Sequence, residues 1–396
     1  MGKRVLQLGG GVWMMRSIES IRQLGHEVYC VDMNPSAPAF AIADGSAAIN
    51  ISDVDGVGKY ADEISADVVL ALNDAGVLPA AYANQKRGIR SYDPEEVKYF
   101  TDKGYMRQRW KEHGVAQPEF VVCTSAEEIK EAIHKIGFPC IVKPCMMWGS
   151  RGVSKVNNEH DIDFATKFAI DNARGNRYIV EEFMSGIEIS VEGLFKDGKA
   201  YILAKADKEL QQHDNYRVTV GINYEAALPS HVLNEIDQLV AAAGRAMGFV
   251  AGALHAECMV TAEGVKMIEM AGRPGGGHIF GAIVEAVSGV SMPQALTRIL
   301  LGEDFDPSAK HHRGACYKFF NAPEGVFERV DNLEEAKRMP GVIDLGFTMS
   351  KGTVVRTMDH GANRPGFVVT EGKDREEAVN RAGAAFQSLT FIMHDH

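Results

Sequence analysis

The chain has 396 residues and a formal net charge of -11 at pH 7, with 45% hydrophobic and 24% charged residues. This length and balance fit a globular protein of two or three domains and exclude a disordered or fibrous chain. The acidic balance also argues against general nucleic-acid binding, which needs a basic surface. No run of about 18 uninterrupted apolar residues occurs, so we expect no membrane-spanning segment.

The cysteine pattern and the N-terminus indicate the cellular compartment. Six cysteines are scattered along the chain without a CxxC pair, which predicts neither a zinc ribbon nor a disulfide framework. Lys3 and Arg4 lead directly into a strand-like segment, without the apolar region of a signal peptide. We therefore expect a protein of the reducing cytoplasm.

Strand and helix patterns alternate at the start of the chain. Strand patterns at residues 5–8, 27–31 and 67–72, with a helix pattern at 14–24, predict a parallel α/β sheet. Three glycines follow the first strand and Asp32 ends the second, as in a dinucleotide-binding fingerprint, but Met14 stands where the third glycine is expected. This turn is either a small-molecule or phosphate site or only a tight turn, and both are favoured over an NAD site.

Domain boundaries follow from the next change of pattern. A helix that begins after Thr101 or Asp102 and stops at Gly114 places a boundary just before residue 99. Strands and helices do not strictly alternate beyond residue 120, which favours an antiparallel α+β unit. The predicted domains are 1–98, 99–186, 187–309 and 310–396, the last being a small closing subdomain.

A candidate phosphate site follows a predicted buried strand that ends at Lys143. The segment Gly149-Ser150-Arg151-Gly152-Val153 comes a few residues later. A lysine charge and backbone N–H groups left accessible by glycine suit a polyphosphate, although the GxxxxGK[ST] pattern is not present. Simple turn chemistry is the alternative explanation. The acids at 181, 182 and 188 suit ribose hydroxyls, or belong to a solvated strand edge.

Glu257 and Glu269 lie symmetrically about a probable hairpin turn. A three-residue loop ending at Gly264 places Val260 opposite Lys266 and the two glutamates opposite each other. Their Cβ atoms would be roughly 5 Å apart, so the carboxylates repel unless a cation lies between them.

Oxygen-only ligands favour Mg²⁺ or Mn²⁺ at this carboxylate pair. Arg273, four residues beyond Glu269, then either clamps an anionic group or forms a structural salt bridge. The competing interpretation of the whole segment is an exposed hairpin with two solvated acids.

Taken in order, these segments resemble the ATP-grasp superfamily of carboxylate-amine ligases over nearly the whole chain. The resemblance implies an ATP-grasp fold, with an N-terminal parallel α/β domain, central antiparallel ATP-grasp domains and a small C-terminal cap. It also implies ATP and Mg²⁺ (or Mn²⁺) as cofactors, and a small-molecule carboxylate and an amine as substrates. The positions matching the nucleotide site are Lys103, Lys143, Gly149, Ser150, Arg151, Gly152, Val153, Glu181, Glu182, Phe183, Met184, Glu188 and Met267.

The resemblance further makes Glu257 and Glu269 the metal ligands and Arg273 the phosphate arginine. Many members carry a third ligand, Asn, where this chain has Ala271, which leaves a second metal ion less secure. The Glu-x-Ala-x-Arg pattern and the C-terminal segment are similar to members that join amino acids, the L-amino-acid ligases.

The implied reaction is the formation of an amide or peptide bond through an acyl phosphate. Phosphoryl transfer needs positioning and charge neutralisation, so Arg273 is expected to matter most for the rate. His213 either orients the amine or accepts its proton, or it is an ordinary surface residue. A homodimer is expected only from the base rate for soluble enzymes.

Other functions remain open at this stage. Within the ligases they are a purine-pathway enzyme, a carbamoyl-phosphate-type enzyme and a biotin-type carboxylase. From other classes they are a non-catalytic ATP-binding regulatory protein and a nicotinamide oxidoreductase, the latter supported only by the first glycine turn and Asp32.

Overall fold

The computed structural model describes residues 2–147, 151–212, 217–356 and 364–394. Contacts divide the chain into two compact units, each made of three segments. The first unit comprises Met1–Pro118, Val191–Leu203 and Pro229–Lys310, and the second comprises Glu119–Ser190, Ala204–Leu228 and His311–His396. The four predicted domain limits stay a prediction.

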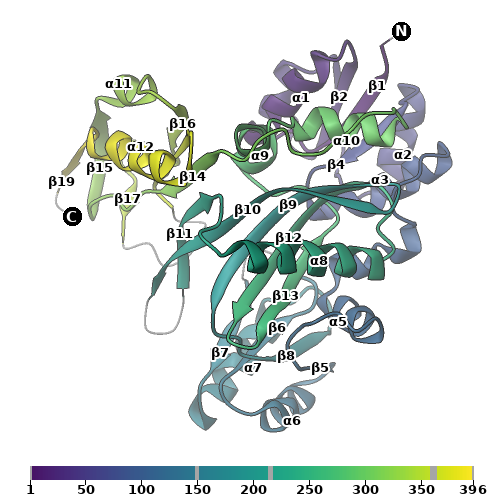
Figure 1. The fold of residues 1–396 in the computed structure, drawn as a ribbon, viewed down its shortest axis with the longest axis vertical. Helices are drawn as coiled ribbons and strands as arrows, with labels where there is room; N and C mark the ends of the chain where they lie inside the picture. Colours follow the sequence, from purple (N-terminus) through teal and green to yellow (C-terminus); the bar gives the residue numbers. More distant parts are fainter. Residues whose placement is uncertain (1, 148–150, 213–216, 357–363, 395–396) are drawn as a thin grey trace. The chain divides into compact units, whose positions relative to one another are not determined.

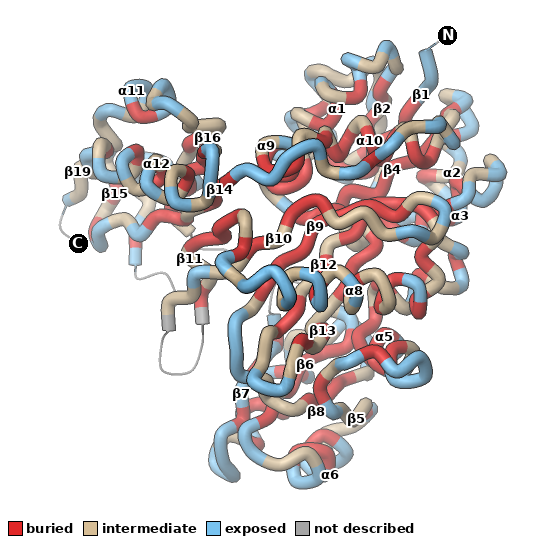
Figure 2. The backbone as a smooth tube through the Cα atoms, in the orientation of Figure 1, coloured by how far each residue is buried: buried red, intermediate tan, exposed pale blue. Residues whose placement is uncertain are grey.

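The first unit begins with a parallel sheet in the order β3-β2-β1-β4 (Figure 1). All four residues of β4 are buried, as expected for a parallel sheet covered on both faces (Figure 2). The predicted N-terminal parallel α/β fold is therefore confirmed. The elements are β1 (Arg4–Leu8), α1 (Met15–Arg22), β2 (Glu27–Asp32), β3 (Gly45–Ala48), α2 (Val54–Glu63), β4 (Val68–Ala71) and α3 (Asp74–Lys86).

The rest of the first unit surrounds an antiparallel hairpin. The strands β12 (Gly252–Thr261) and β13 (Gly264–Ala271) form this hairpin, and β9 (Ile187–Lys196) lies beside β12. Asp102 caps α5 by accepting hydrogen bonds from Gly104 and Tyr105, at the predicted helix start. The helices are α4 (Lys98–Thr101), α5 (Lys103–Glu112), α8 (Ser230–Ala246), the π-helix η5 (Ile279–Ile283), α9 (Val284–Ser288) and α10 (Met292–Leu300).

The register of the hairpin differs from the prediction in an informative way. Thr261 pairs with Gly264, so the turn has two residues and Val260 faces Val265; the predicted Val260–Lys266 pair is wrong. A β-bulge then shifts the register between Cys258 and Glu257, which places Glu257 opposite Glu269 as predicted. The extra residue in β13 compensates for the shorter turn.

Aromatic packing supports the end of this hairpin. Tyr92, Phe100 and Phe249 have ring centroids 5.1 to 5.2 Å apart, and Phe195 stacks on Phe249 at 4.6 Å. The Tyr92 hydroxyl donates a 2.5 Å hydrogen bond to the carbonyl oxygen of Gly272. The backbone that leads from β13 to Arg273 is thus fixed from the core.

The second unit holds antiparallel sheets, in agreement with the predicted mixed α+β content. One sheet has the order β5-β8-β6-β7, and its core includes residues from α6 and α7. Residues from 316 onward form a separate hydrophobic core, in which Val368 packs with buried alanines of α12. The bounds are β5 (Phe120–Cys123), α6 (Ala126–Ile136), β6 (Cys140–Pro144), β7 (Ser154–Val156), α7 (Ile162–Asp171), β8 (Tyr178–Glu182), β10 (Lys199–Gln212), β11 (Arg217–Tyr224), β14 (Gly314–Phe319), β15 (Gly325–Asp331), α11 (Leu333–Lys337), β16 (Val342–Phe347), β17 (Val354–Val355), β18 (Gly366–Gly372), α12 (Arg375–Gln387) and β19 (Thr390–His394).

Within the described residues, no single helix has the length and apolar character needed to cross a membrane. One sharply bent pair, Ile279–Ser288 with Met292–Leu300, passes that test on length and composition when both parts are taken together.

Candidate active site

Two carboxylates face each other on the hairpin of the first unit. Glu257 and Glu269 are directly opposite, and their side chains are 25% and 32% exposed. A cationic side chain lies beside each of them: Lys103 Nζ is 3.2 Å from Glu269 Oε1, and His255 Nε2 is 3.7 Å from Glu257 Oε1. The alternative of two fully solvated acids is therefore wrong, because both acids have cationic neighbours.

Helix α5 holds the second of these acids in place. Lys103 and Arg107 are four residues apart, so their side chains lie on the same face of α5. Lys103 donates to the Glu269 carboxylate, and Arg107 donates a 2.6 Å hydrogen bond to the carbonyl oxygen of Ile268, the bulged residue. The buried guanidinium thereby satisfies a backbone acceptor that the bulge removes from the ladder.

A buried carboxylate ties the hairpin to the loop that follows Arg273. Glu192 is fully buried on β9, accepts a 2.6 Å hydrogen bond from His255 Nδ1 and accepts a 3.0 Å hydrogen bond from the Gly275 N–H. Burial alone would lower the pKa of His255, but attraction to Glu192 and the bonds to Glu192 and Glu257 raise it to about 9. At neutral pH this histidine is a cation between two glutamates.

Arg273 lies in a two-contact ion pair with Asp74. Its Nε and Nη2 are each 3.0 Å from an Asp74 oxygen, and both side chains are less than one-fifth exposed. Asp74 is the first residue of α3, and Asn73 caps that helix by accepting from Gly76. The structural salt bridge considered for Arg273 is therefore present, and it does not exclude a role in binding an anion.

The first glycine turn has a structural explanation. Asp32 accepts a 2.8 Å hydrogen bond from the Gly10 N–H and a 2.9 Å bond from Asn34, so its carboxylate fixes this turn. A Cβ on Gly10 would approach Ala37 to 2.8 Å. These contacts support the explanation of this segment as a tight structural turn. Nearby, Trp13 packs edge-on against His278, with ring centroids 4.6 Å apart.

The second unit contains the predicted nucleotide strands. Lys143 Nζ lies 2.6 Å from Glu181 Oε2, and both side chains are buried. Glu188 forms an ion pair with Lys208, and the Lys155 ammonium lies 4.1 Å from the ring centre of Phe183. A cation thus pairs with an acid between β6 and β8 and again between β9 and β10, and such groups suit phosphates and ribose hydroxyls.

The other predicted nucleotide positions divide into three groups. Gly149, Ser150 and the candidate base His213 lie outside the described residues. Arg151 is exposed, Val153 is 37% exposed, and Gly152 has φ +73° with no room for a Cβ beside Pro144. Glu182 and Met184 are half-buried. Met267 is fully buried, its N–H bonds to Ala116, and it contacts Cys258.

The residues present fit a magnesium ion better than a softer metal. In the part of the chain that the structure describes, no group of three His, Cys, Asp or Glu residues is placed to hold a metal ion by itself. Glu257 and Glu269 supply hard oxygen donors, and Mg²⁺ takes one or two carboxylates and completes its shell with phosphate oxygens and water. The carboxylate pair therefore suits an ion that arrives with a phosphate ligand.

The cysteines do not supply a nucleophile. All six are free and buried, and burial raises the pKa of Cys123 and Cys140 to about 11. The thiols of Cys123 and Cys140 therefore stay protonated at neutral pH and react poorly.

Sequence reasoning missed two residues of this arrangement, Asp74 and Glu192. Asp74 follows a buried parallel strand, and polar residues at the carboxyl ends of such strands commonly bind ligands. Glu192 is an acid within the apolar run Ile189-Ser190-Val191-Glu192-Gly193-Leu194, where burial requires a partner. Both signals were available in the sequence.

Comparison with known proteins agrees with this geometry. Residues 136–281 match the family model described as ATP-grasp domain. This range contains Lys143, Glu257, Glu269 and Arg273. The chain contains an ATP-grasp domain. A second model, L-amino acid ligase C-terminal domain 2, matches residues 318–394, so the ATP-grasp region is followed by a C-terminal domain similar to that of L-amino acid ligases.

The proteins and solved structures similar to this chain include transferases and ligases. A formate-dependent phosphoribosylglycinamide formyltransferase from Flavobacterium psychrophilum is 25% identical over 276 residues, which cover 68% of this chain and 70% of the relative. The protein of the same name from Methanocaldococcus jannaschii is 31% identical over 186 residues. These residues cover 46% of this chain and 48% of that relative, so the match spans about half of each protein. The crystal structure of an L-amino acid ligase from Bacillus licheniformis has a TM-score of 0.85 at 20% identity, with 100% of this chain and 99% of that chain covered. That likeness confirms the predicted ATP-grasp fold.

Proposed function

We propose that the protein is an ATP-dependent ligase that joins amino acids, or an amino acid and another small carboxylate, through an amide bond. The observation that carries the proposal is the opposed pair Glu257 and Glu269, with Lys103 beside it and Arg273 four residues further on. The match of residues 318–394 to an L-amino acid ligase domain favours amino acids as substrates.

In the first step, an oxygen of the substrate carboxylate attacks the γ-phosphorus of ATP, the bond to ADP breaks, and an acyl phosphate forms. Glu257 and Glu269 would hold Mg²⁺, which neutralises phosphate charge when bound. Lys103 and Lys143 bind phosphate oxygens as point charges. Because positioning and charge neutralisation suffice for this transfer, the protein needs no nucleophile of its own.

In the second step, the amine nitrogen attacks the acyl carbon, the bond to phosphate breaks, and the nitrogen loses a proton. Arg273 stabilises the negative charge that develops on the departing phosphate. To do so, its guanidinium shares or exchanges the contacts that it makes with Asp74. His213 remains the candidate that orients the amine.

A purine-pathway ligase is the second candidate. It is favoured by the similarity to phosphoribosylglycinamide formyltransferases over about two-thirds of the chain.

The homodimer and the cytoplasmic location stay predictions.

The decisive experiment measures ADP release from Mg²⁺-ATP with amino acids singly and in pairs, with phosphoribosylglycinamide plus formate as a separate arm. ADP formed only with particular amino-acid pairs, and lost in Arg273→Ala, supports the proposal. ADP formed only in the nucleotide arm would replace it with the purine reaction. ATP binding without turnover in any arm would favour a regulatory protein.

A further inference from the structure

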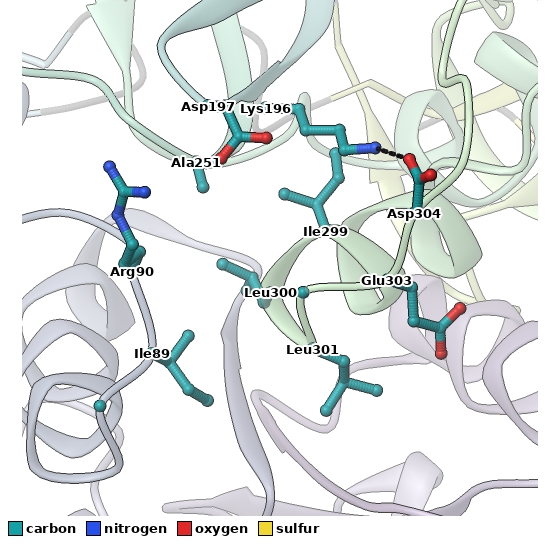
Figure 3. A pocket seen from close by; sticks show the side chains of 12 residues that line it. Ile89, Arg90, Lys196, Asp197, Ala251, Ile299, Leu300, Leu301, Glu303 and Asp304 are labelled. Atoms are coloured by element: carbon teal, nitrogen blue, oxygen red, sulfur yellow. Dashed lines mark ion pairs between the residues drawn. The ribbon is translucent and has the colours of Figure 1, made fainter.

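A cavity of about 420 Å³ lies in the first unit, where α3 and α10 end beside the turn between β9 and β10 (Figure 3). This volume is in the range of small-molecule sites. The cavity is distinct from the candidate active site. Ala251, on its wall, is separated from Glu257 by roughly 20 Å of extended strand. Arg90 lies beyond one end of α3, whose other end, about 18 Å away, carries Asp74.

The floor of the cavity is apolar. It consists of Ile89, Ala251, Ile299, Leu300 and Leu301, of which three are more than nine-tenths buried. Figure 3 shows Ile299 and Leu300 between Arg90 on one side and the Lys196–Asp304 pair on the other. An alkyl or aromatic group placed on this floor would lose contact with water and be stabilised by about 25 cal/mol for each Å² buried.

Three of the charges around the floor, those of Lys196, Asp304 and Glu303, are already compensated within the protein. Lys196 Nζ donates a 2.6 Å hydrogen bond to the Phe305 carbonyl oxygen and lies 3.6 Å from Asp304. Glu303 forms a 2.7 Å ion pair with Arg298. These groups shape the rim but have partners of their own.

Arg90 and Asp197 are different. Both are exposed, both line the cavity, and neither forms an ion pair with another side chain in the described parts of the chain. Asp197 has φ +53°, a conformation that Asp and Asn tolerate better than other side chains with a Cβ.

We propose that this cavity binds a zwitterion with an apolar side chain, either an apolar α-amino acid or a short apolar peptide. The carboxylate of the ligand pairs with the planar guanidinium of Arg90, and its ammonium pairs with Asp197. Its side chain covers Ile299 and Leu300. This inference uses only the groups that line the cavity, so it does not depend on the proposed ligase reaction.

Isothermal titration of the full-length chain without ATP tests the proposal, with L-leucine and L-leucyl-L-leucine as probes. Which of the two binds more tightly decides between a free amino acid and a peptide. Two control compounds each lack one charge: 4-methylpentanoate has no ammonium, and 3-methylbutylamine has no carboxylate. Because an ion pair with an exposed group is worth about 0.2–1 kcal/mol, both controls should bind more weakly than leucine, by up to about fivefold.

Three variants locate the binding. Arg90→Gln and Asp197→Asn each remove one charge from an exposed position, and Asn keeps the backbone conformation at residue 197. Each should weaken binding by up to about fivefold, with unchanged melting temperatures. Arg273→Ala should leave this binding intact.

Three results would overturn the proposal: no heat of binding with either probe, unchanged affinity in Arg90→Gln and Asp197→Asn, or binding that disappears in Arg273→Ala. ADP release is measured separately, so failure of the ligase reaction with retained cavity binding, or the reverse, identifies which of the two proposals is wrong.

Discussion

Asp74 and Arg273 form a two-contact ion pair, with both carboxylate oxygens of Asp74 3.0 Å from the guanidinium, although the residues lie 199 positions apart. The contacts use Nε and Nη2, donors that an anionic substrate group would also need. Asp74 therefore orients Arg273 and competes with such a group at the same time.

Replacing Arg273 is expected to abolish most turnover. Arg273→Ala should lower kcat/KM for ADP formation by about 100- to 1000-fold, because a positioned donor to developing charge is lost. Arg273→Lys should recover little, since an ammonium does not reproduce the two-contact geometry. Asp74→Asn should fall between wild type and Arg273→Ala. Near-normal turnover in Arg273→Ala would show that Arg273 acts only through its structural salt bridge with Asp74 and has no role in catalysis.

The carboxylate pair can be tested with a control on the same hairpin. Glu257→Gln and Glu269→Gln should each lower ADP formation about 100-fold or more and raise the Mg²⁺ concentration needed for half-maximal rate, because an anionic oxygen ligand is lost. Glu263→Gln changes an exposed glutamate of the hairpin turn whose ion pair with Lys266 lies at the surface, so it should behave like wild type. Equal Mg²⁺ dependence in all three variants would contradict metal binding at this pair.

Variants of the buried pair Lys143 and Glu181 should change stability and ATP binding independently. Lys143→Ala leaves Glu181 without this partner and should cost about 3–5 kcal/mol of unfolding free energy, with loss of ATP binding. The double variant Lys143→Met with Glu181→Leu should regain most of the stability, because an apolar pair replaces two buried charges. ATP binding should stay lost in the double variant. Its return there, measured by calorimetry, would show that Lys143 does not contact the nucleotide.

Two neighbouring glycines give a matched pair for the loop after Arg273. A Cβ on Gly275 would lie 2.6 Å from Glu192 Oε1 and 2.8 Å from Ile279, whereas a Cβ on Gly276 meets no atom within 4 Å. Gly275→Ala should therefore destabilise the protein by about 1–3 kcal/mol, while Gly276→Ala should be close to neutral. Chemical denaturation of both variants checks this, and equal stabilities would contradict the Glu192–Gly275 contact.

His255 predicts a pH dependence of stability. Its pKa is raised from 6.5 to about 9 in the folded chain, so folding favours the protonated form. This contribution, of order 3 kcal/mol, is complete below pH 6.5 and is lost as the pH rises through 9. The unfolding free energy of wild type relative to His255→Gln should fall over that window without divalent ions. The exposed His231, changed to Gln, is the control, and a flat difference for His255→Gln would contradict the prediction.

Much of the fold was predictable because its signals are local. Alternating strands and helices gave the first sheet, and the Asp102 cap gave the start of α5. The opposition of Glu257 and Glu269 was also predicted correctly, but from a turn that was one residue too long. The extra residue at the bulge compensates for the turn that is one residue shorter than predicted, so the two glutamates still face each other. The bulge itself was not predictable, since the group that stabilises it is Arg107, 161 residues from Ile268 along the chain.

The site was predictable where residue type alone sets the chemistry and unpredictable where partners are distant. Lysines, glycines and paired acids at typical spacings indicated phosphate and metal binding. The pairing of Asp74 with Arg273 and the double acceptance by Glu192 depend on which strands become neighbours, and no local pattern records that.

The bulge in the hairpin affects which insertions and deletions related chains can tolerate in the turn and in β13. Side chains alternate along a strand, so one residue added or removed on either side of the turn moves every later side chain to the opposite face. Here the bulge at Ile268 supplies one extra residue, and the turn of Ala262 and Glu263 is one residue shorter than a bulge-free hairpin would need. Turn length and bulge are therefore exchangeable. An insertion in the turn accompanied by deletion of Ile268 would give a bulge-free hairpin of the same length, with the two glutamates still face to face.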